Sequence, residues 1–99
     1  MAALEVLDAA TVDQRLAQGL DWGRDGDELV KTQTEKDFAS ALGFVNRVGE
    51  LAEQMNHHPD IDIRWNKVTL RLSTHSAGGI TSNDLELAAQ IDGLSKASG

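Results

Sequence analysis

The stretch IDIRWNKVTLRLST, residues 61–74, carries the clearest strand pattern in the chain. Apolar side chains occupy every second position on either side of its middle: Ile61, Ile63, Trp65, Val68, Leu70 and Leu72. Such alternation is typical of strands with one buried face, and Asn66-Lys67 favours a tight turn between them. The stretch therefore predicts a β-hairpin of residues 61–65 and 67–74, with Trp65 in the core or in an interface.

Two amphipathic helices are expected on either side of this hairpin. Before it, residues 37–56 carry apolar side chains at steps of three and four: Phe38, Leu42, Val45, Val48, Ala52 and Met55. This spacing indicates one face of a long helix, and Pro59 ends it. After the hairpin, Thr81 is placed to cap a closing helix. The apolar positions of that helix are Leu85, Leu87, Ala88, Ile91 and Leu94.

The N-terminal third predicts a further helix and a further hairpin. Asp8 can cap a helix through about Gln18, and Gly19 suits the next position because glycine enters the left-handed region without steric penalty. Asp25-Gly26 is a turn signal between two short extended runs. Residues 1–99 are therefore expected to form one α+β domain in the order α-β-β-α-β-β-α. Hairpins separated by helices favour a four-stranded antiparallel sheet with the helices on one face.

The composition restricts the classes of function to consider. The chain has 99 residues, no cysteine and a formal net charge of −7. It therefore lacks disulfides and thiolate ligands, and its charge repels phosphate backbones and anionic lipid, so neither direct nucleic-acid binding nor membrane binding is expected. The N-terminal MAALEVLDAATVDQ carries acids where a signal peptide carries bases, and no segment reaches the roughly 20 apolar residues of a membrane span. We expect a soluble, cytoplasmic protein.

The three histidines of the chain fall at the ends of predicted elements. His57 and His58 follow the long helix, and His75 stands at the end of the last strand. Glu53 precedes His57 by four residues and therefore shares its helical face, so its carboxylate can orient or charge an imidazole. Imidazoles titrate near neutral pH, and element ends are where binding and catalytic groups concentrate. The three residues are therefore candidates for acid–base catalysis.

Each candidate also has a purely structural interpretation. His57 or His58 could stabilise the negative end of the helix dipole, and His75 could mark a solvated strand end. Asp84 stands three residues after Thr81 and could complete a capping box. A zinc site of three histidines is conceivable, but the chain has neither a His-x-x-x-His nor a His-x-His pair. We therefore expect no metal, and the sequence contains no phosphate loop and no dinucleotide fingerprint.

The run Glu53-x-x-x-His57-His58-Pro59, followed by Trp65, His75 and Asp84, resembles the signature of the pterin-4a-carbinolamine dehydratases. Three longer segments are similar to the same family: DFASALGFVNRVGELAEQMNHHPD, WNKVTLRLSTH and STHSAGGITSND. The resemblance implies the α-β-β-α-β-β-α fold and the removal of water from 4a-hydroxytetrahydropterin, which gives the quinonoid dihydropterin. This reaction recycles the pterin after aromatic amino acid hydroxylases have used it.

The resemblance also implies roles for individual residues. The positions that match the active-site histidines are His57, His58 and His75, and those that match residues binding or orienting the substrate are Glu53, Trp65 and Asp84. We assign the acid–base work to His58 and His75, and we expect His57 to bind or polarise the substrate. One departure is Ile61, because many family members carry an aromatic residue there. This chain is expected to lack an aromatic wall on that side of the pterin.

The chemistry explains why histidines suit this reaction. Dehydration of a carbinolamine needs an acid to protonate the departing hydroxide and a base to take the proton of a ring nitrogen. Imidazoles can hold both protonation states near neutral pH, and the electron pair of the nitrogen drives the departure. Neither a metal nor an organic cofactor is therefore required, and the expected ligand is the pterin substrate alone.

The resemblance leaves one alternative function and one expectation about assembly. Some members of the family serve as assembly or dimerisation partners, so a non-catalytic protein-binding module of the same fold is the alternative. Homo-oligomers, either dimers or tetramers, are expected by likeness to the family. The polar segment DELVKTQTE could form an edge strand that pairs across a two-fold axis.

Overall fold

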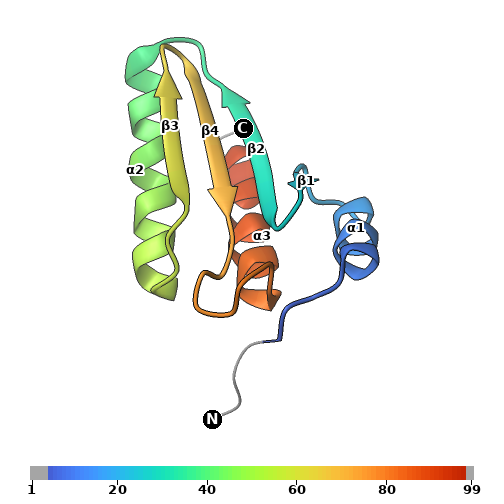
Figure 1. Ribbon diagram of the computed structural model, residues 1–99. Coiled ribbons are helices and arrows are strands. Elements are labelled where there is room, and N and C mark those ends of the chain that lie inside the picture. The colour runs from blue at the N-terminus through green and yellow to red at the C-terminus, as the bar shows by residue number, and fades with distance from the viewer. Residues whose placement is uncertain (1–4, 98–99) are drawn as a thin grey trace.

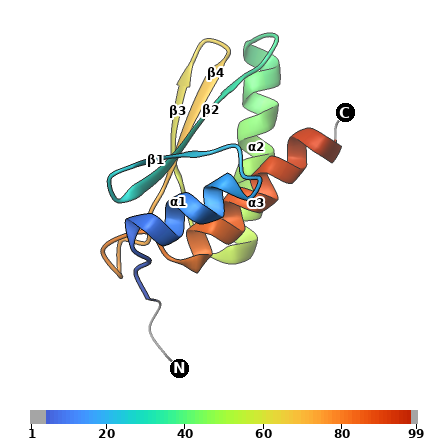
Figure 2. The ribbon, with the colours of Figure 1, turned by 90° about the vertical axis from the view of Figure 1, so that its right-hand side faces the viewer.

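The computed structural model describes residues 5–97, with side chains for residues 5–94, and it has the predicted order of elements (Figure 1). The elements are α1 (Ala9–Ala17), β1 (Gly23–Asp25), β2 (Glu28–Thr34), α2 (Phe38–Met55), β3 (Asp60–Arg64), β4 (Lys67–Leu72) and α3 (Ser82–Ala97). The strands form one antiparallel sheet in the order β1-β2-β4-β3. Helices α2 and α3 cover one face of this sheet, and α1 lies beside β1 (Figure 2). The predicted α+β architecture is confirmed.

Aspartates cap the first two helices: Asp8, as predicted, and Asp37, the first residue of the range predicted for the long helix. Asp8 accepts a hydrogen bond from the backbone N–H of Thr11 at 2.8 Å, and Asp37 accepts one from Ser40 at 2.8 Å. These backbone N–H groups hold the pKa of both aspartates below its ordinary value. The first helix is followed by Gly19 with a φ of +130°, a conformation that favours glycine. Local chemistry therefore fixes the ends of these elements.

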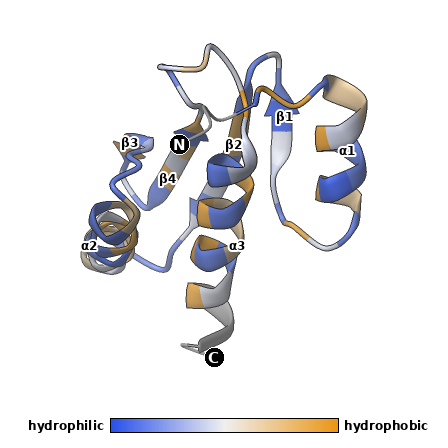
Figure 3. Ribbon diagram, turned by 90° about the horizontal axis from the view of Figure 1, so that it is seen from below, coloured by the Kyte–Doolittle hydropathy of each residue, from blue (hydrophilic) through white to orange (hydrophobic). Residues whose placement is uncertain are grey.

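The register of the sheet turns alternate residues of β2 and β4 toward the helices. Leu29 pairs with Leu72 and Lys31 pairs with Leu70, which places these positions on the inner face. The buried apolar side chains form one core: Val12, Trp22, Leu29, Ala41, Phe44, Val48, Ala52, Val68, Leu70, Leu72, Ile80, Leu85, Leu87, Ala88 and Ile91. Seen from below, α2 and α3 lie side by side on one side of the sheet (Figure 3). The core therefore fills the space between the helix layer and the sheet.

The predicted inner face of α2 is partly wrong. Phe38 and Leu42 were expected to face the core, but they are 44% and 40% exposed. The core contacts are made instead by Ala41 and Phe44, together with Val48. The helix carries apolar residues on two neighbouring stripes, and its contact area with the sheet and α3 covers only one of them. Periodicity alone does not distinguish the two stripes.

The turn between β3 and β4 lies one residue earlier than predicted, so Trp65 belongs to the turn and not to the strand. Arg64 pairs with Lys67, so Trp65 and Asn66 form the two-residue turn. Trp65 has a φ of +55° and is 67% exposed, so it is not a core side chain, and its place in an interface stays a prediction. Tight hairpin turns require left-handed backbone, which takes a residue out of the alternation of the strand. The first hairpin turn lies at Gly26 and Asp27, one residue later than predicted.

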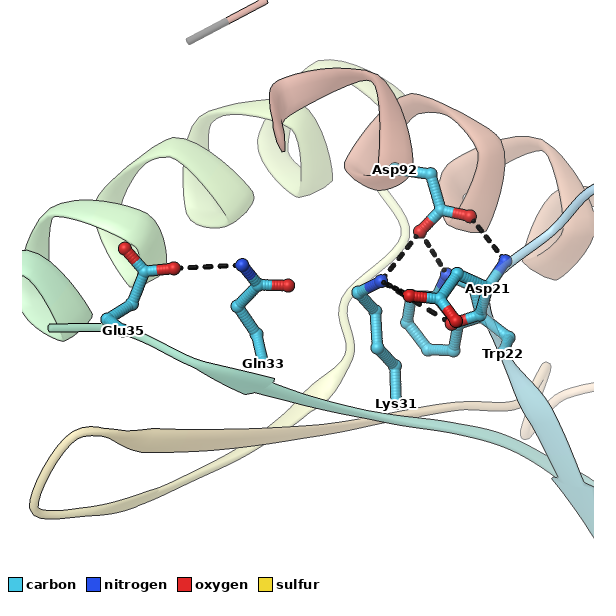
Figure 4. A network of polar contacts seen from close by, with 6 residues as sticks. All are labelled: Asp21, Trp22, Lys31, Gln33, Glu35 and Asp92. Carbon is cyan, nitrogen blue, oxygen red and sulfur yellow. Dashed lines mark hydrogen bonds and ion pairs between the residues drawn. The ribbon is translucent and has the colours of Figure 1, made fainter. Parts of the chain in front are cut away.

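A polar network joins β2, α3 and the segment after α1 (Figure 4). The side chain of Lys31 is 5% exposed, and its Nζ lies 3.1 Å from Asp92 Oδ1 and 3.1 Å from Asp21 Oδ2. Asp92 also accepts hydrogen bonds from Trp22 Nε1 at 2.9 Å and from the backbone N–H of Asp21 at 2.8 Å. A charged residue on the inner face of β2 is thus paired with a carboxylate from the helix layer.

Candidate active site

Three segments meet at one end of the domain: the end of α2, the loop between β4 and α3, and the first turn of α3 (Figure 1). Helix α2 ends at Met55 and is followed by its C-cap Asn56, whose φ of 50° places it in the left-handed region. The loop is closed by Thr74, whose backbone N–H donates to Gly79 O at 2.9 Å and whose carbonyl accepts from Gly78 N at 2.9 Å. The φ of Gly78 is +86°, which explains a glycine there. These turns bring all three histidines to the same end of the sheet.

His57 is held by a carboxylate from another element. Its Nε2 lies 2.5 Å from Oδ1 of Asp84, which belongs to the first turn of α3. The side chain of His57 is 11% exposed and that of Asp84 is fully buried. A short contact between a buried carboxylate and an imidazole is a strong, oriented interaction, because neither group can turn to water instead. Both residues were candidates from the sequence, but the contact between them was not predicted.

The second oxygen of Asp84 has its own partners. Asp84 Oδ2 accepts hydrogen bonds from the backbone N–H of Thr81 at 2.8 Å and from Thr74 Oγ1 at 2.8 Å. The bond from Thr81 is the capping box that the spacing of the two residues indicated, so the structural interpretation of Asp84 is confirmed. The same carboxylate also binds His57. Asp84 therefore serves the helix end and the imidazole at once.

His58 is paired with Glu53, and this corrects the expected pairing of Glu53 with His57. Oε2 of Glu53 forms a short contact with Nε2 of His58. The side chains are 55% and 77% exposed for His58 and Glu53, so this pair is open to solvent. The i,i+4 rule fails here because the left-handed Asn56 ends the helix before His57. The imidazole that contacts Glu53 is therefore that of His58, five residues further along the chain.

His75 lies in the loop rather than in the strand. Strand β4 ends at Leu72, so the predicted extension to residue 74 is too long, although Thr74 forms an isolated bridge with Gly79. His75 is exposed and directly follows Thr74, whose hydroxyl contacts Asp84. The loop that carries His75 is thus fastened to the carboxylate that holds His57. Nothing in the sequence pointed to a role for Thr74 beyond its place next to a histidine.

Two other residues named from the sequence lie elsewhere. Trp65 occupies the turn at the far end of β3, a strand of five residues. At about 3.3 Å per residue, that turn is roughly 15 Å from the end of the strand that follows His58. Ile61 lies in β3 opposite Leu70 and is 40% exposed. Trp65 therefore lies far from the end of the sheet that carries the histidines, whereas Ile61 is close to His58 in the sequence.

Two features are absent from the described residues. Among the side chains of residues 5–94, no group of three histidine, aspartate or glutamate residues is arranged to hold a metal ion. No helix in the part of the chain that the structure describes is long and apolar enough to cross a membrane.

Fold and site together define a class: small α+β domains in which imidazole–carboxylate pairs lie at one end of a helix-covered antiparallel sheet. The model of the pterin 4 alpha carbinolamine dehydratase family matches residues 5–94. The chain belongs to this family. The resemblance of the histidine motif to that family is thereby confirmed.

Curated relatives cover nearly the whole chain. A protein of Roseiflexus castenholzii, provisionally named a pterin-4-alpha-carbinolamine dehydratase, is 55% identical over 92 residues, which are 93% of this chain and 97% of the relative. A protein of Nocardia farcinica with the same provisional name is 51% identical over 88 residues, covering 85% of this chain and 93% of the relative. The family relationship therefore extends over the full domain.

Two solved structures share the fold. A transcriptional coactivator/pterin dehydratase from Brucella melitensis superposes with a TM-score of 0.84 at 26% identity, covering 90% of this chain and 97% of that protein. A pterin dehydratase-like protein, described as a RuBisCO assembly factor in the alpha-carboxysome, gives a TM-score of 0.61 at 21% identity over 76% of this chain and 87% of that protein. The second likeness concerns the fold alone.

Proposed function

We propose that this protein is a dehydratase that removes water from 4a-hydroxytetrahydropterin and forms the quinonoid dihydropterin. The observation that carries the proposal is the presence of two imidazole–carboxylate contacts, His57–Asp84 and His58–Glu53, at the end of the domain where the loop of His75 also lies. The family supplies the substrate class. The contacts supply groups that can move protons.

The reaction breaks the C–O bond at C4a and removes the proton of the neighbouring ring nitrogen. The electron pair of that nitrogen forms the new C=N bond, so no electrons enter or leave the substrate. The oxygen leaves as water only if it receives a proton, and the nitrogen must lose one, so the site needs one acid and one base. Two imidazoles in opposite protonation states meet this requirement near neutral pH.

The two carboxylates decide which imidazole nitrogen is left for a substrate. Asp84 contacts Nε2 of His57, and Glu53 contacts Nε2 of His58. An ionised carboxylate only accepts hydrogen bonds, so we assign a proton to each Nε2, and each Nδ1 is left to accept or donate a proton elsewhere. His58 and His75 are the more exposed histidines and are assigned the acid and base roles. The mostly buried His57 binds or polarises the substrate.

A spectroscopic assay with freshly generated 4a-hydroxytetrahydropterin tests the proposal. The wild type is expected to accelerate formation of the quinonoid product, and the variant His57→Ala/His58→Ala/His75→Ala is expected to show only the uncatalysed rate. Asn46→Ala, an exposed change on α2, is the control and should keep the wild-type rate. A wild-type rate equal to the uncatalysed rate would rule out the proposed activity.

A protein-binding role is the second candidate, and an exposed apolar pair favours it. Phe38 and Leu42 lie one helical turn apart on α2 and are 44% and 40% exposed. In addition, β1 pairs only with residues 28–30 of β2, so residues 31–34 are open to pairing on that side. We propose that the partner bound by these surfaces is a second copy of this chain, so that the protein forms a homo-oligomer. Light scattering should give a mass above the 10.7 kDa of one chain, and a monomer mass at micromolar concentration would exclude the assembly.

A further inference from the structure

We propose that Thr74 and Thr81 are positioning residues that act through Asp84 on His57 and on the loop of His75. The inference rests on the proposed dehydratase function and concerns how its histidines are held in place. It starts from a buried hydrogen-bond chain that links the loop after β4 to the first turn of α3. Thr74 is 5% exposed, and Thr81 and Asp84 are fully buried.

The direction of each hydrogen bond in this chain follows from counting protons. Thr74 Oγ1 donates its single proton to Asp84 Oδ2 at 2.8 Å, because a carboxylate only accepts. The contact of 2.7 Å between Thr74 Oγ1 and Thr81 Oγ1 must then take its proton from Thr81. Thr81 Oγ1 in turn accepts from the backbone N–H of Asn83 at 3.3 Å. The chain therefore runs in one direction, from Asn83 through both threonines to Asp84.

This direction fixes the carboxylate. Oδ2 of Asp84 receives two donors, the hydroxyl of Thr74 and the backbone N–H of Thr81, and Oδ1 is left to His57. With both oxygens engaged in a buried site, the carboxylate has one preferred rotation, and His57 meets it through Nε2. Removing the hydroxyl of Thr74 leaves Oδ2 with one donor where water has little access. The carboxylate can then turn, and the imidazole is no longer held in one orientation.

The same hydroxyl also ties His75 to the site. Thr74 closes the loop through its backbone bonds to Gly78 and Gly79, and His75 is the next residue. The side chain of Thr74 is therefore a direct connection between the loop of His75 and the carboxylate of His57. A hydrogen bond in this position can set the separation of two histidines that come from different elements.

Three variants separate this role from simple packing. Thr74→Val removes the hydroxyl and keeps the shape, whereas Thr74→Ser keeps the hydroxyl. Thr11→Val is the matched control, because Thr11 is exposed on α1 and its backbone N–H, which the change keeps, donates to Asp8. The kcat/KM of Thr74→Val is expected to fall roughly tenfold, Thr74→Ser should recover most of it, and Thr11→Val should match the wild type. If Thr74→Val does not fold, Thr74→Ala removes the same hydroxyl without adding a methyl group against the carboxylate.

Nitrogen-15 NMR of the histidine rings gives a readout that does not require turnover. His57 in the wild type and in Thr74→Ser should show a proton fixed on Nε2, and Thr74→Val should show exchange between ring states. A wild-type tautomer and wild-type kcat/KM in Thr74→Val overturn the inference, and so does an equal loss of activity in Thr74→Val and Thr74→Ser. If the wild type itself shows no turnover, the proposed function fails, and the NMR comparison alone decides the positioning role.

Discussion

Replacing His75 by alanine is expected to lower kcat for the proposed dehydration by roughly 10²–10⁴-fold, the usual contribution of one acid–base group. The residue stands in the exposed loop that Thr74 fastens to Asp84, so its imidazole can reach a substrate while its backbone stays anchored. Without the imidazole, either the departing oxygen lacks its proton donor or the ring nitrogen lacks its acceptor. Stopped-flow absorbance of the quinonoid product measures the change.

His58→Ala should produce a loss of the same size, because acid and base act in one step. The two variants together test the assignment, since the anchoring of the loop does not depend on either imidazole. Both should keep the Tm of the wild type within a few degrees, because exposed side chains contribute little to stability. Unchanged turnover in both variants would end the assignment of these two histidines to acid–base catalysis.

Asp92→Ala is expected to cost about 3 kcal/mol of unfolding free energy, which is the range seen when one partner of a buried ion pair is removed. The change leaves Lys31 Nζ, Trp22 Nε1 and the backbone N–H of Asp21 without their shared acceptor. The expected value lies at the low end of that range because the largely exposed Asp21 stays beside Lys31. For a domain of this size, a drop in Tm of more than roughly 10 °C should follow. Urea unfolding and calorimetry both measure it.

Two controls test whether burial of the Lys31–Asp92 ion pair causes the loss of stability. Asp13→Ala removes the partner of Arg24 in a more exposed pair, with side chains 54% and 26% exposed, and should leave the free energy of unfolding close to that of the wild type. The double variant Lys31→Met/Asp92→Leu removes both charges and should recover most of the loss, because no buried charge is left unpaired. The interpretation fails if Asp92→Ala is as mild as Asp13→Ala.

Most of the fold could be predicted because its signals are local. Alternation along β4, the three- and four-residue steps of α2, and the cap at Asp8 depend on neighbours a few residues away. The errors arose where two local patterns compete. Trp65 fits the alternation of β3, but the turn needs its backbone in the left-handed region. In α2, two apolar stripes satisfy the same periodicity, and only the position of the sheet selects one.

The sequence by itself determined the order of elements, the family motif and the identity of the histidines and acids. Only the tertiary structure decided which acid holds which imidazole. Asp84 contacts His57, from which it is 27 residues away in the sequence, whereas Glu53 contacts His58 rather than the nearer His57. Such pairings depend on where the chain turns back, here at the left-handed Asn56 and in the loop closed by Thr74. Periodicity reports which side of an element is buried, whereas a long-range polar contact depends on how two elements pack.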